Sequence, residues 1–387
     1  MLCFLKEKIF DKALRRQLII SAVMIFFCGG ISFVSLMPEK DAPQGSKEKA
    51  VVLSVDNSRL QDLGLLKQGE QFLEIEIQSG RFKGEKFPAV NQVRAQLELD
   101  KIFQKGDIIL AAVTDDAVPN ETQLNAQDYY RINWSILLFA LFALLLIIFA
   151  GITGFNALLS FVFSALFIWK IVVPLLLNGV NALLVCFAAA VLLSFVIITL
   201  VSGLTKKSAA ALSGTLLGVL ASCGTAYIFT EIFKINGAIM PYSQVLIYSG
   251  FANLSISDIY TGAIFLSSSG AVMDLAMDVA SSSEELARKN PGMTVKELMF
   301  SGFRIGRSVV GTMTTTLLLA YSGGYITLMM AFAAQGVEPI DFINNPHVAS
   351  EVVKTLVGSF GLVLVAPFTA IAGAFLFGDK KNMKVEQ

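Results

Sequence analysis

The amino-acid sequence predicts a mainly α-helical, polytopic membrane protein that carries one small β-rich domain. The chain has 387 residues, of which 55% are hydrophobic and only 16% are charged, whereas a typical soluble domain has about 25% charged residues. Most of the hydrophobic residues lie in long runs after residue 133, and the one sizeable polar region is 38–132. We therefore expect about eight transmembrane helices, with the polar domain inserted between the first and the second.

The segment 1–37 is predicted to be a basic cytoplasmic N-terminus followed by the first transmembrane helix. Its first 16 residues include five lysines and arginines, and an apolar run follows at 18–36. A run of about 19 residues is long enough to cross the hydrocarbon core of a bilayer. Basic residues favour the cytoplasmic side, so we expect an uncleaved anchor. A cleaved signal peptide is the alternative.

The region 38–132 is predicted to form a small OB-like β-barrel outside the cytoplasm. Its segments 50–55, 71–78, 90–99 and 107–113 alternate apolar and polar residues or are rich in β-branched residues, and glycine-containing turns separate them. Four or five such strands suit a small barrel. No strand combines aromatic and basic residues on one face, so we expect a docking or gating module without a nucleic-acid partner.

The region 133–378 is predicted to hold the remaining transmembrane helices, and 379–387 a basic cytoplasmic tail. The segment 322–335 is shorter than the roughly 17–25 residues that a crossing helix needs, which favours a re-entrant or broken segment. Eight crossings with both ends in the cytoplasm place the basic loops inside; nine crossings are the alternative. The predicted spans after the first are 134–150, 154–173, 180–202, 208–230, 258–280, 305–321 and 354–377.

The loop 281–303 is predicted to form a short helical hairpin between two of these spans. Ser281 with Glu284, and Thr294 with Glu297, both match the capping-box spacing, in which a hydroxyl and a carboxylate satisfy the first amides of a helix. The sequence Asn-Pro-Gly at 290–292 interrupts the chain between the two boxes. A further short helix is expected at 245–254, on the outer surface or dipping inward.

Two acids on one span and two arginines at the beginning of the next are the main candidates for a functional site. Asp274 and Asp278 are four residues apart and so lie on the same face of a helix. Ionisable residues within a span are costly and are functional candidates. We expect Asp274 to be the titrating or coordinating group, with Arg307 or Arg304 as its partner. Asp278 is closer to the end of the span.

Hydroxyl groups near these charges are candidates for ion handling. Thr312, Thr314 and Thr315 follow the arginines on the same span, and hard cations bind oxygen ligands. The alternative is that the acids and arginines form a structural ion pair between two helices, because breaking a buried pair costs about 3–5 kcal/mol.

The sequence contains no motif for a cofactor, a metal site or catalysis. The four cysteines lie near the N-terminus or in apolar runs, and His347 is the only histidine. These counts exclude a disulfide framework and a histidine-rich metal site. No phosphate-binding P-loop motif is present either. We therefore expect no cofactor and no enzymatic activity.

Three motifs resemble the YibE/F-like family of bacterial multi-pass membrane proteins. They are SGAVMDLAM at 269–277, IGR at 305–307 followed by GTMTTTLLLAY at 311–321, and LVGSFGLVL at 356–364. The polar region is also similar to the external part of that family. The resemblance implies a permease-like component of the bacterial plasma membrane. It further implies a hetero-oligomer with a related membrane chain.

The chain departs from this family pattern at three positions. The family pattern has an aspartate directly after the arginine that matches Arg307, where this chain has Ser308, and a serine where this chain has Asp278. Thr315 stands where the pattern more often has asparagine. We hypothesise that Asp278 replaces the missing acid from the neighbouring helix and faces Ser308.

The sequence therefore predicts a transporter or permease, or a subunit of one, that uses an intramembrane Asp/Arg site. Because no ATP-binding motif is present, we expect coupling to an ion gradient or to a partner. The alternative is a membrane scaffold or assembly factor in which the same charges only connect helices. The substrate does not follow from the sequence.

Overall fold

The computed structural model describes residues 2–38, 45–97 and 99–379. It divides into two compact units, Glu39–Leu145 and the combination of Met1–Pro38 with Leu146–Gln387. The boundary near residue 145 lies inside a helix; the predicted domain boundary at 132 stays a prediction. The predicted basic tail 379–387 lies outside the described residues except for Asp379.

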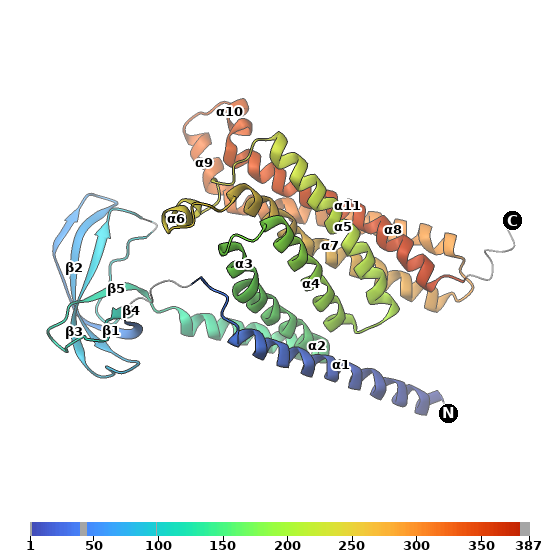
Figure 1. Cartoon of the computed structure of the whole chain (residues 1–387), viewed down its shortest axis with the longest axis horizontal. Coiled ribbons are helices and arrows are strands. Elements are labelled where there is room, and N and C mark those ends of the chain that lie inside the picture. Colours follow the sequence, from blue (N-terminus) through green and yellow to red (C-terminus); the bar gives the residue numbers. More distant parts are fainter. Residues whose placement is uncertain (1, 39–44, 98, 380–387) are drawn as a thin grey trace. The chain divides into compact units, whose positions relative to one another are not determined.

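The first unit contains a closed five-stranded β-barrel, which confirms the predicted small β-barrel (Figure 1). The strand order is β1-β2-β3-β5-β4, and every neighbouring pair is antiparallel except β3 with β5. The strand β5 was not among the segments predicted from sequence. The strands are β1 (Ser46–Asp62), β2 (Lys67–Ile77), β3 (Lys86–Arg94), β4 (Ile108–Val113) and β5 (Leu124–Tyr129).

The barrel is filled by the inward-facing side chains of its alternating strands, together with one buried amide network. Phe87, Ile75 and Ile109 are completely buried. The side-chain amide of Gln71 donates to the carbonyl oxygen of Phe103 at 2.9 Å and accepts from the Phe103 amide at 3.0 Å. Buried polar groups need such partners, so Gln71 ties the segment before β4 to the barrel wall.

An ion-pair cluster closes the barrel near the end of β5. The Asp128 carboxylate accepts from the Tyr129 amide at 2.7 Å and from Arg131 at 2.8 Å, and it lies 3.3 Å from Lys101 Nζ. Partial burial by itself raises the pKa of Asp128, but these three donors outweigh burial and hold the pKa below its usual value.

The second unit is a helical bundle, and six helical segments of the described chain are long and apolar enough to cross a membrane. The sequence predicted eight crossings. The difference arises because 132–177 forms one helical segment, and because the apolar part of the first helix, Gln17–Phe33, is short. The segment 132–177 is interrupted at Gly151, whose φ of 56° and ψ of −128° are not helical. That break lies between the predicted spans 134–150 and 154–173.

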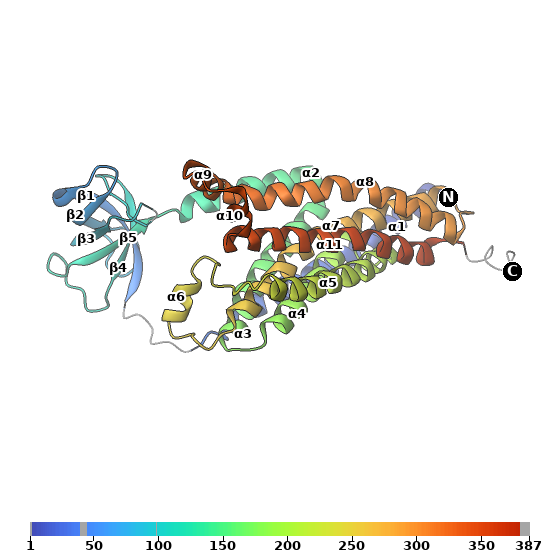
Figure 2. The same ribbon diagram turned by 90° about the horizontal axis from the view of Figure 1, so that it is seen from above.

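The helices of this unit follow one another with few irregular connections (Figures 1 and 2). A π-helical turn at Ile168–Val172 joins α2 to α3, and a 3-10 turn at Gly323–Tyr325 joins α8 to α9. The helices are α1 (Leu2–Phe33), α2 (Ile132–Phe167), α3 (Val173–Leu177), α4 (Ala182–Ser202), α5 (Lys206–Ile232), α6 (Ser243–Tyr248), α7 (Ile256–Lys289), α8 (Val295–Ser322), α9 (Ile326–Ala334), α10 (Pro339–Asn344) and α11 (Pro346–Phe377).

The segment 322–335 contains no helix long enough to cross a membrane. Its helix α9 has nine residues, and nine residues rise only about 14 Å along a helix. The 3-10 turn at Gly323–Tyr325 separates α9 from α8, as expected for a broken segment.

The predicted helical hairpin in 281–303 is only half correct. The capping box of Thr294 and Glu297 is present and begins α8. A short helix, α6, does form near the predicted 245–254, although it is shorter; its location on the outer surface stays a prediction. Ser281 and Glu284, however, lie inside α7, which continues to Lys289. A capping box has no effect where the helix is already formed, and the first residues that stop α7 are 290–292.

Small residues allow the central helices to approach closely. Helix α11 packs against α5, α7 and α8 (Figure 2). A Cβ added to Gly306 would lie 2.8 Å from the Cβ of Ala366, and one added to Gly302 would lie 2.7 Å from the Cβ of Ala370. The G-x-x-x-G motif that Gly302 and Gly306 form in α8 therefore packs on an A-x-x-x-A surface of α11, as small residues do between helices in lipid.

Buried polar side chains connect the outer helices to this core. Asn156 of α2 is almost fully buried. It accepts from Ser21 of α1 at 2.6 Å and donates to the carbonyl oxygen of Leu200 of α4 at 3.0 Å. One asparagine thus joins three helices.

Replacing Gly306 by valine should destabilise the bundle by about 1–3 kcal/mol, because the added methyl groups would overlap Ala366. Gly224→Val is the matched control, since nothing lies within 4 Å of a Cβ at Gly224. Each variant is solubilised in detergent and heated, and its melting temperature is taken from the loss of the folded peak in size-exclusion chromatography. Equal shifts for the two variants would contradict this packing.

Replacing Asp128 by asparagine should destabilise the barrel at neutral pH. A carboxyl whose folded pKa is lowered stabilises the fold above its unfolded pKa of about 3.9, and this stabilisation is lost as the pH falls through the folded pKa. Hydrogen exchange in β4 and β5, corrected for its intrinsic pH dependence, should differ from wild type at pH 7 and converge toward pH 3. The exposed Asp115→Asn is the control; a difference independent of pH would argue against the ion-pair cluster.

Candidate functional site on the outward faces of α7 and α8

The candidate site is formed by α7 and α8, which are antiparallel neighbours joined by a tight connection. The Ser255 side chain caps the first turn of α7, and Thr294 caps α8. The apolar side of α7 carries Val272, Leu275 and Val279, all fully buried against the other helices of the core. This burial fixes which side of α7 turns outward.

The outward face of α7 is small and acidic. Its exposed residues between 263 and 282 are Ala263, Ser267, Asp274 and Asp278. They recur at spacings of four, seven and four residues, which are close to whole turns of a helix, and so form one stripe along it. The predicted common face of Asp274 and Asp278 is therefore present.

The outward face of α8 is polar throughout the region of the arginines. Between 303 and 316, no apolar side chain is exposed, and Phe303 and Val309 pack against the core of the bundle. The exposed residues of this stretch are Arg304, Arg307, Ser308, Gly311, Thr312, Thr315 and Thr316.

Three close approaches define the register between α7 and α8. A Cβ at Gly302 would lie 3.5 Å from Ser283, and one at Gly306 would lie 3.8 Å from Val279. Farther along, Ser268 and Leu317 both lie beside Gly358 of α11. All three approaches agree with one antiparallel alignment.

That alignment determines the relative levels of the charged residues. It places Asp278 at the same height along the helix axes as Arg307, and Asp274 at the same height as Gly311; residues at the same height are called level below. The two acidic turns of α7 therefore run beside the arginine and the first threonine turns of α8.

A cleft of about 570 Å³ lies between the two helices at the end where they are connected. Arg304 and Ile305 of α8 face the serines and Glu285 of α7 across it. Helical geometry places Arg307 about 60° around α8 from Arg304, on the side away from Ile305. The lining residues are Ser281, Ser282, Glu285, Leu286, Ser301, Arg304 and Ile305.

The predicted ion pair between the acids and the arginines is not formed within the part of the chain that the structure describes. No atom of Asp274 or Asp278 lies within 4 Å of the charged nitrogens of Arg304 or Arg307 among the recorded pairs. Glu285, which shares the cleft with Arg304, pairs instead with Lys289 at 3.4 Å and with Arg288. The arginines turn outward because the small side of α8, with Gly302 and Gly306, is held against α11.

The threonine hydroxyls bond to their own helix. Thr312 donates to the carbonyl oxygen of Val309 at 2.9 Å, and Thr314 donates to that of Val310 at 2.8 Å. Such back-bonding occupies the proton and leaves oxygen lone pairs free to accept. Thr312 and Thr315 present theirs on the outward face, whereas Thr314 is half-buried.

The suggested contact between Asp278 and Ser308 is not recorded as a hydrogen bond among the described residues. Both side chains are exposed, and the register places them within one residue of the same level. The exchange of an acid between the two helices stays a prediction.

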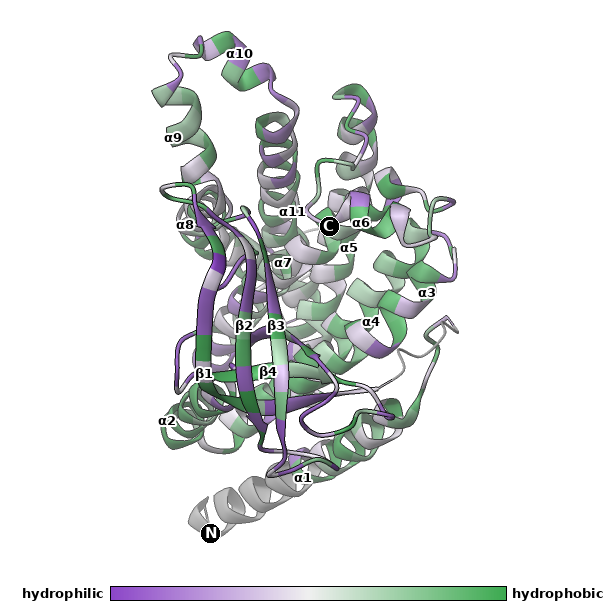
Figure 3. Cartoon of the chain, turned by 90° about the vertical axis from the view of Figure 1, so that its left-hand side faces the viewer, coloured by the Kyte–Doolittle hydropathy of each residue, from purple (hydrophilic) through white to green (hydrophobic). Residues whose placement is uncertain are grey.

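The outward faces of α7 and α8 differ from a lipid-facing surface. Helix α2 shows the usual pattern: it is coloured as largely hydrophobic in Figure 3, and its Leu138, Leu145 and Phe149 are all strongly exposed. A charged or hydroxyl-bearing face within a membrane has no favourable partner in hydrocarbon. The two outward faces therefore need water or another protein surface against them.

Sequence reasoning assigned no role to Glu351, the only acidic residue of α11. Its side chain is 15% exposed; Oε1 lies 3.4 Å from Lys354 Nζ, while the buried Oε2 has no hydrogen-bond partner in the described structure. Glu351 and Tyr325 line an apolar pocket of about 270 Å³ between α8, α9 and α11. The presence of an acid one turn from a lysine in an apolar helix was the signal that could have identified it.

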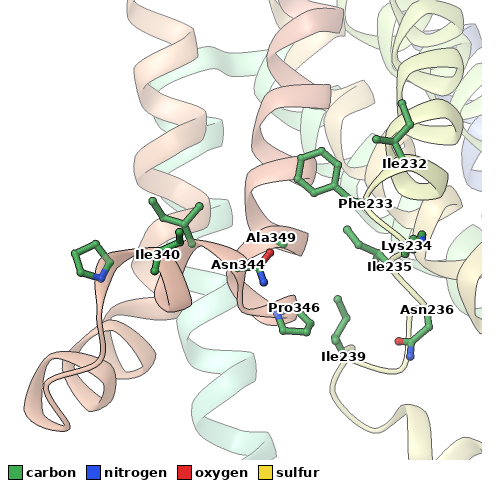
Figure 4. A pocket seen from close by; sticks show the side chains of 12 residues that line it. Ile232, Phe233, Lys234, Ile235, Asn236, Ile239, Ile340, Asn344, Pro346 and Ala349 are labelled. Carbon is green, nitrogen blue, oxygen red and sulfur yellow. The ribbon is translucent and has the colours of Figure 1, made fainter.

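A wider cleft lies where the end of α5 meets α10 and the start of α11 (Figure 4). It has a volume of about 1030 Å³ and is lined mainly by apolar side chains such as Ile232, Ile239 and Ile340. Lys234 is its only charged lining residue. In the described residues, no three histidine, cysteine, aspartate or glutamate side chains are placed to hold a metal ion.

A family model described as YibE/F-like protein matches residues 138–379. The chain belongs to the YibE/F-like family. The match covers more than half of this YibE/F-like chain and includes both outward faces, and with the apolar helices it shows a membrane protein. The barrel lies outside the match, so the predicted similarity of the polar region to the family has no support from it. No curated protein and no solved structure matches the chain.

Proposed function

We propose that this YibE/F-like chain is a transporter, or the membrane subunit of one, and that the outward faces of α7 and α8 form part of its path. The observation that supports the proposal most directly is the placement of Asp274. It lies within an apolar helix, on a face that the described part of the chain leaves uncovered, and no cation of the described residues pairs with it.

The chemistry of the two faces suits the handling of protons or hard cations. Asp274 is level with Gly311, beside the turns that carry Thr312 and Thr315. Carboxylate and hydroxyl oxygens are suitable ligands for hard cations. A carboxylate that changes its charge during a cycle is also a common element of proton relays in membrane proteins. Coupling to an ion gradient is therefore part of the proposal.

The alternative function is a membrane scaffold or assembly factor. In that case the charged faces would hold a related membrane chain and carry nothing. The absence of an ion pair to Asp274 among the described residues does not by itself decide between the two functions, because a path and a docking face both require groups that are not already neutralised. The proposed location is the bacterial plasma membrane.

Asp274→Asn should abolish ion flux while leaving the fold intact. The full chain is reconstituted in proteoliposomes with an internal pH-sensitive dye, and an imposed pH gradient is dissipated with or without a potassium diffusion potential. Wild type should dissipate the gradient faster than protein-free vesicles, and Asp274→Asn should match those vesicles, because an amide cannot exchange a proton or neutralise a cation.

Two controls separate transport from misfolding. Asp341→Asn, an exposed acid on α10, should transport as wild type does, and both variants should elute as one symmetrical peak in detergent. Full flux in Asp274→Asn would rule out a role for this carboxylate. The scaffold function would be favoured if the wild-type protein showed no flux and if Asp274→Asn lost a membrane chain that binds to the wild-type protein.

A further inference from the structure

The outward faces of α7 and α8 carry opposite charges on the two helices of one surface. The acids belong to α7 and the arginines to α8, and both sets are exposed. A surface with this arrangement is complementary to a second copy of itself. Turning one copy by a half-turn brings the acidic helix of each chain against the basic helix of the other.

The depth of the charges in the membrane supports the same partner. Two copies in one membrane share an orientation, so a two-fold axis along the membrane normal leaves the depth of every residue unchanged. Asp278 is level with Arg307 within one chain. Consequently Asp278 of one copy lies at the depth of Arg307 of the other copy, and Asp274 lies one turn away from it.

The direction of Arg307 favours an ion pair with the acids of a second copy over an ion pair with Asp278 or Asp274 of its own chain. Arg304 lines the cleft that α8 shares with α7, whereas Arg307 lies on the side of α8 away from that cleft. Gly302 and Gly306 hold α8 against α11, and this contact prevents α8 from rotating to bring Arg307 toward α7. The guanidinium of Arg307 is therefore available to a neighbouring chain.

The membrane makes this pairing favourable where a soluble protein would gain little. An exposed ion pair in water contributes about 0–1 kcal/mol, but unpaired charges in hydrocarbon are costly. Small residues on both faces, Ala263 and Gly311, also leave room for a close approach.

We infer that the chain forms a two-fold symmetric dimer in which Asp278 and Asp274 of each copy pair with Arg307 of the other. The partner is a second copy of this chain, and it supplies each acidic face with a cation, which the described residues of the same chain do not provide. The inference does not depend on transport, because the same dimer would exist in a scaffold.

Charge-exchange variants test whether the pairing occurs between copies. Asp278→Arg alone and Arg307→Asp alone should each weaken dimerisation at least about tenfold, because like charges then face each other twice. Mixing the two variants should restore it, because each mixed dimer contains one native pair and one reversed pair. The monomer–dimer equilibrium is measured by mass photometry of the full chain in detergent and in lipid nanodiscs.

The mixed experiment distinguishes pairing between copies from pairing within a chain. Pairing within one chain would be restored only when both changes are present in the same molecule, and mixing would have no effect. Asp341→Arg is the matched control and should dimerise as wild type does. A single symmetrical elution peak for each variant shows that the fold is retained.

Disulfide crosslinking tests the geometry in native membranes. Two differently tagged copies are made in a background with the native cysteines changed to alanine. One carries Ala271→Cys and the other carries Thr315→Cys. The helix register places these two positions within one residue of the same height along the helix axes. Mild oxidation should join the two tags. Leu192→Cys with Val363→Cys, which are exposed on α4 and α11, should not crosslink.

Three results would overturn the proposed dimer. They are a monomeric wild type in nanodiscs without crosslinking, mixed variants that fail to dimerise, and crosslinking only to a chain of another mass. The last result would show that a different protein covers the two faces.

Discussion

The close approach of α8 to α11 is the contact on which the rest of the candidate site depends. Gly302 and Gly306 lie so close to Ala370 and Ala366 that a side chain at either glycine would clash with them. This contact determines the rotation of α8 about its own axis. Once that side is buried, Arg307, Thr312 and Thr315 can only face outward. Larger residues at these two positions would move α8 away and change the direction of every polar group on it.

A second constraint comes from the solvent rather than from the chain. Hydrocarbon cannot satisfy carboxylates, guanidinium groups or free hydroxyl lone pairs. The helix α2 meets this constraint with exposed leucine and phenylalanine side chains, whereas α7 and α8 do not. A membrane protein with an uncovered polar face needs water or protein at that face, and both proposals above follow from this requirement.

Glu351 shows a different solution to the same problem. Its carboxylate is mostly buried, with Lys354 close to one oxygen, and Lys354 lies 4.7 Å from the ring centre of Tyr321. The acid therefore has local partners inside its own chain. Asp274 and Asp278 lack such partners in the described structure. They, and not Glu351, therefore need a transported ion or a second chain.

The sequence by itself determined the class of the protein, because composition and the length of apolar runs directly reflect the solvent around a helix. It also predicted the barrel, the capping box at Thr294 and the shared face of Asp274 and Asp278, all of which depend on residues close in sequence. Only the tertiary structure decided where the arginines point. Their direction depends on the contact between α8 and α11, whose residues are about sixty positions apart, and local spacing contains no information about such a contact. The fifth strand and the buried state of Glu351 required the fold for the same reason.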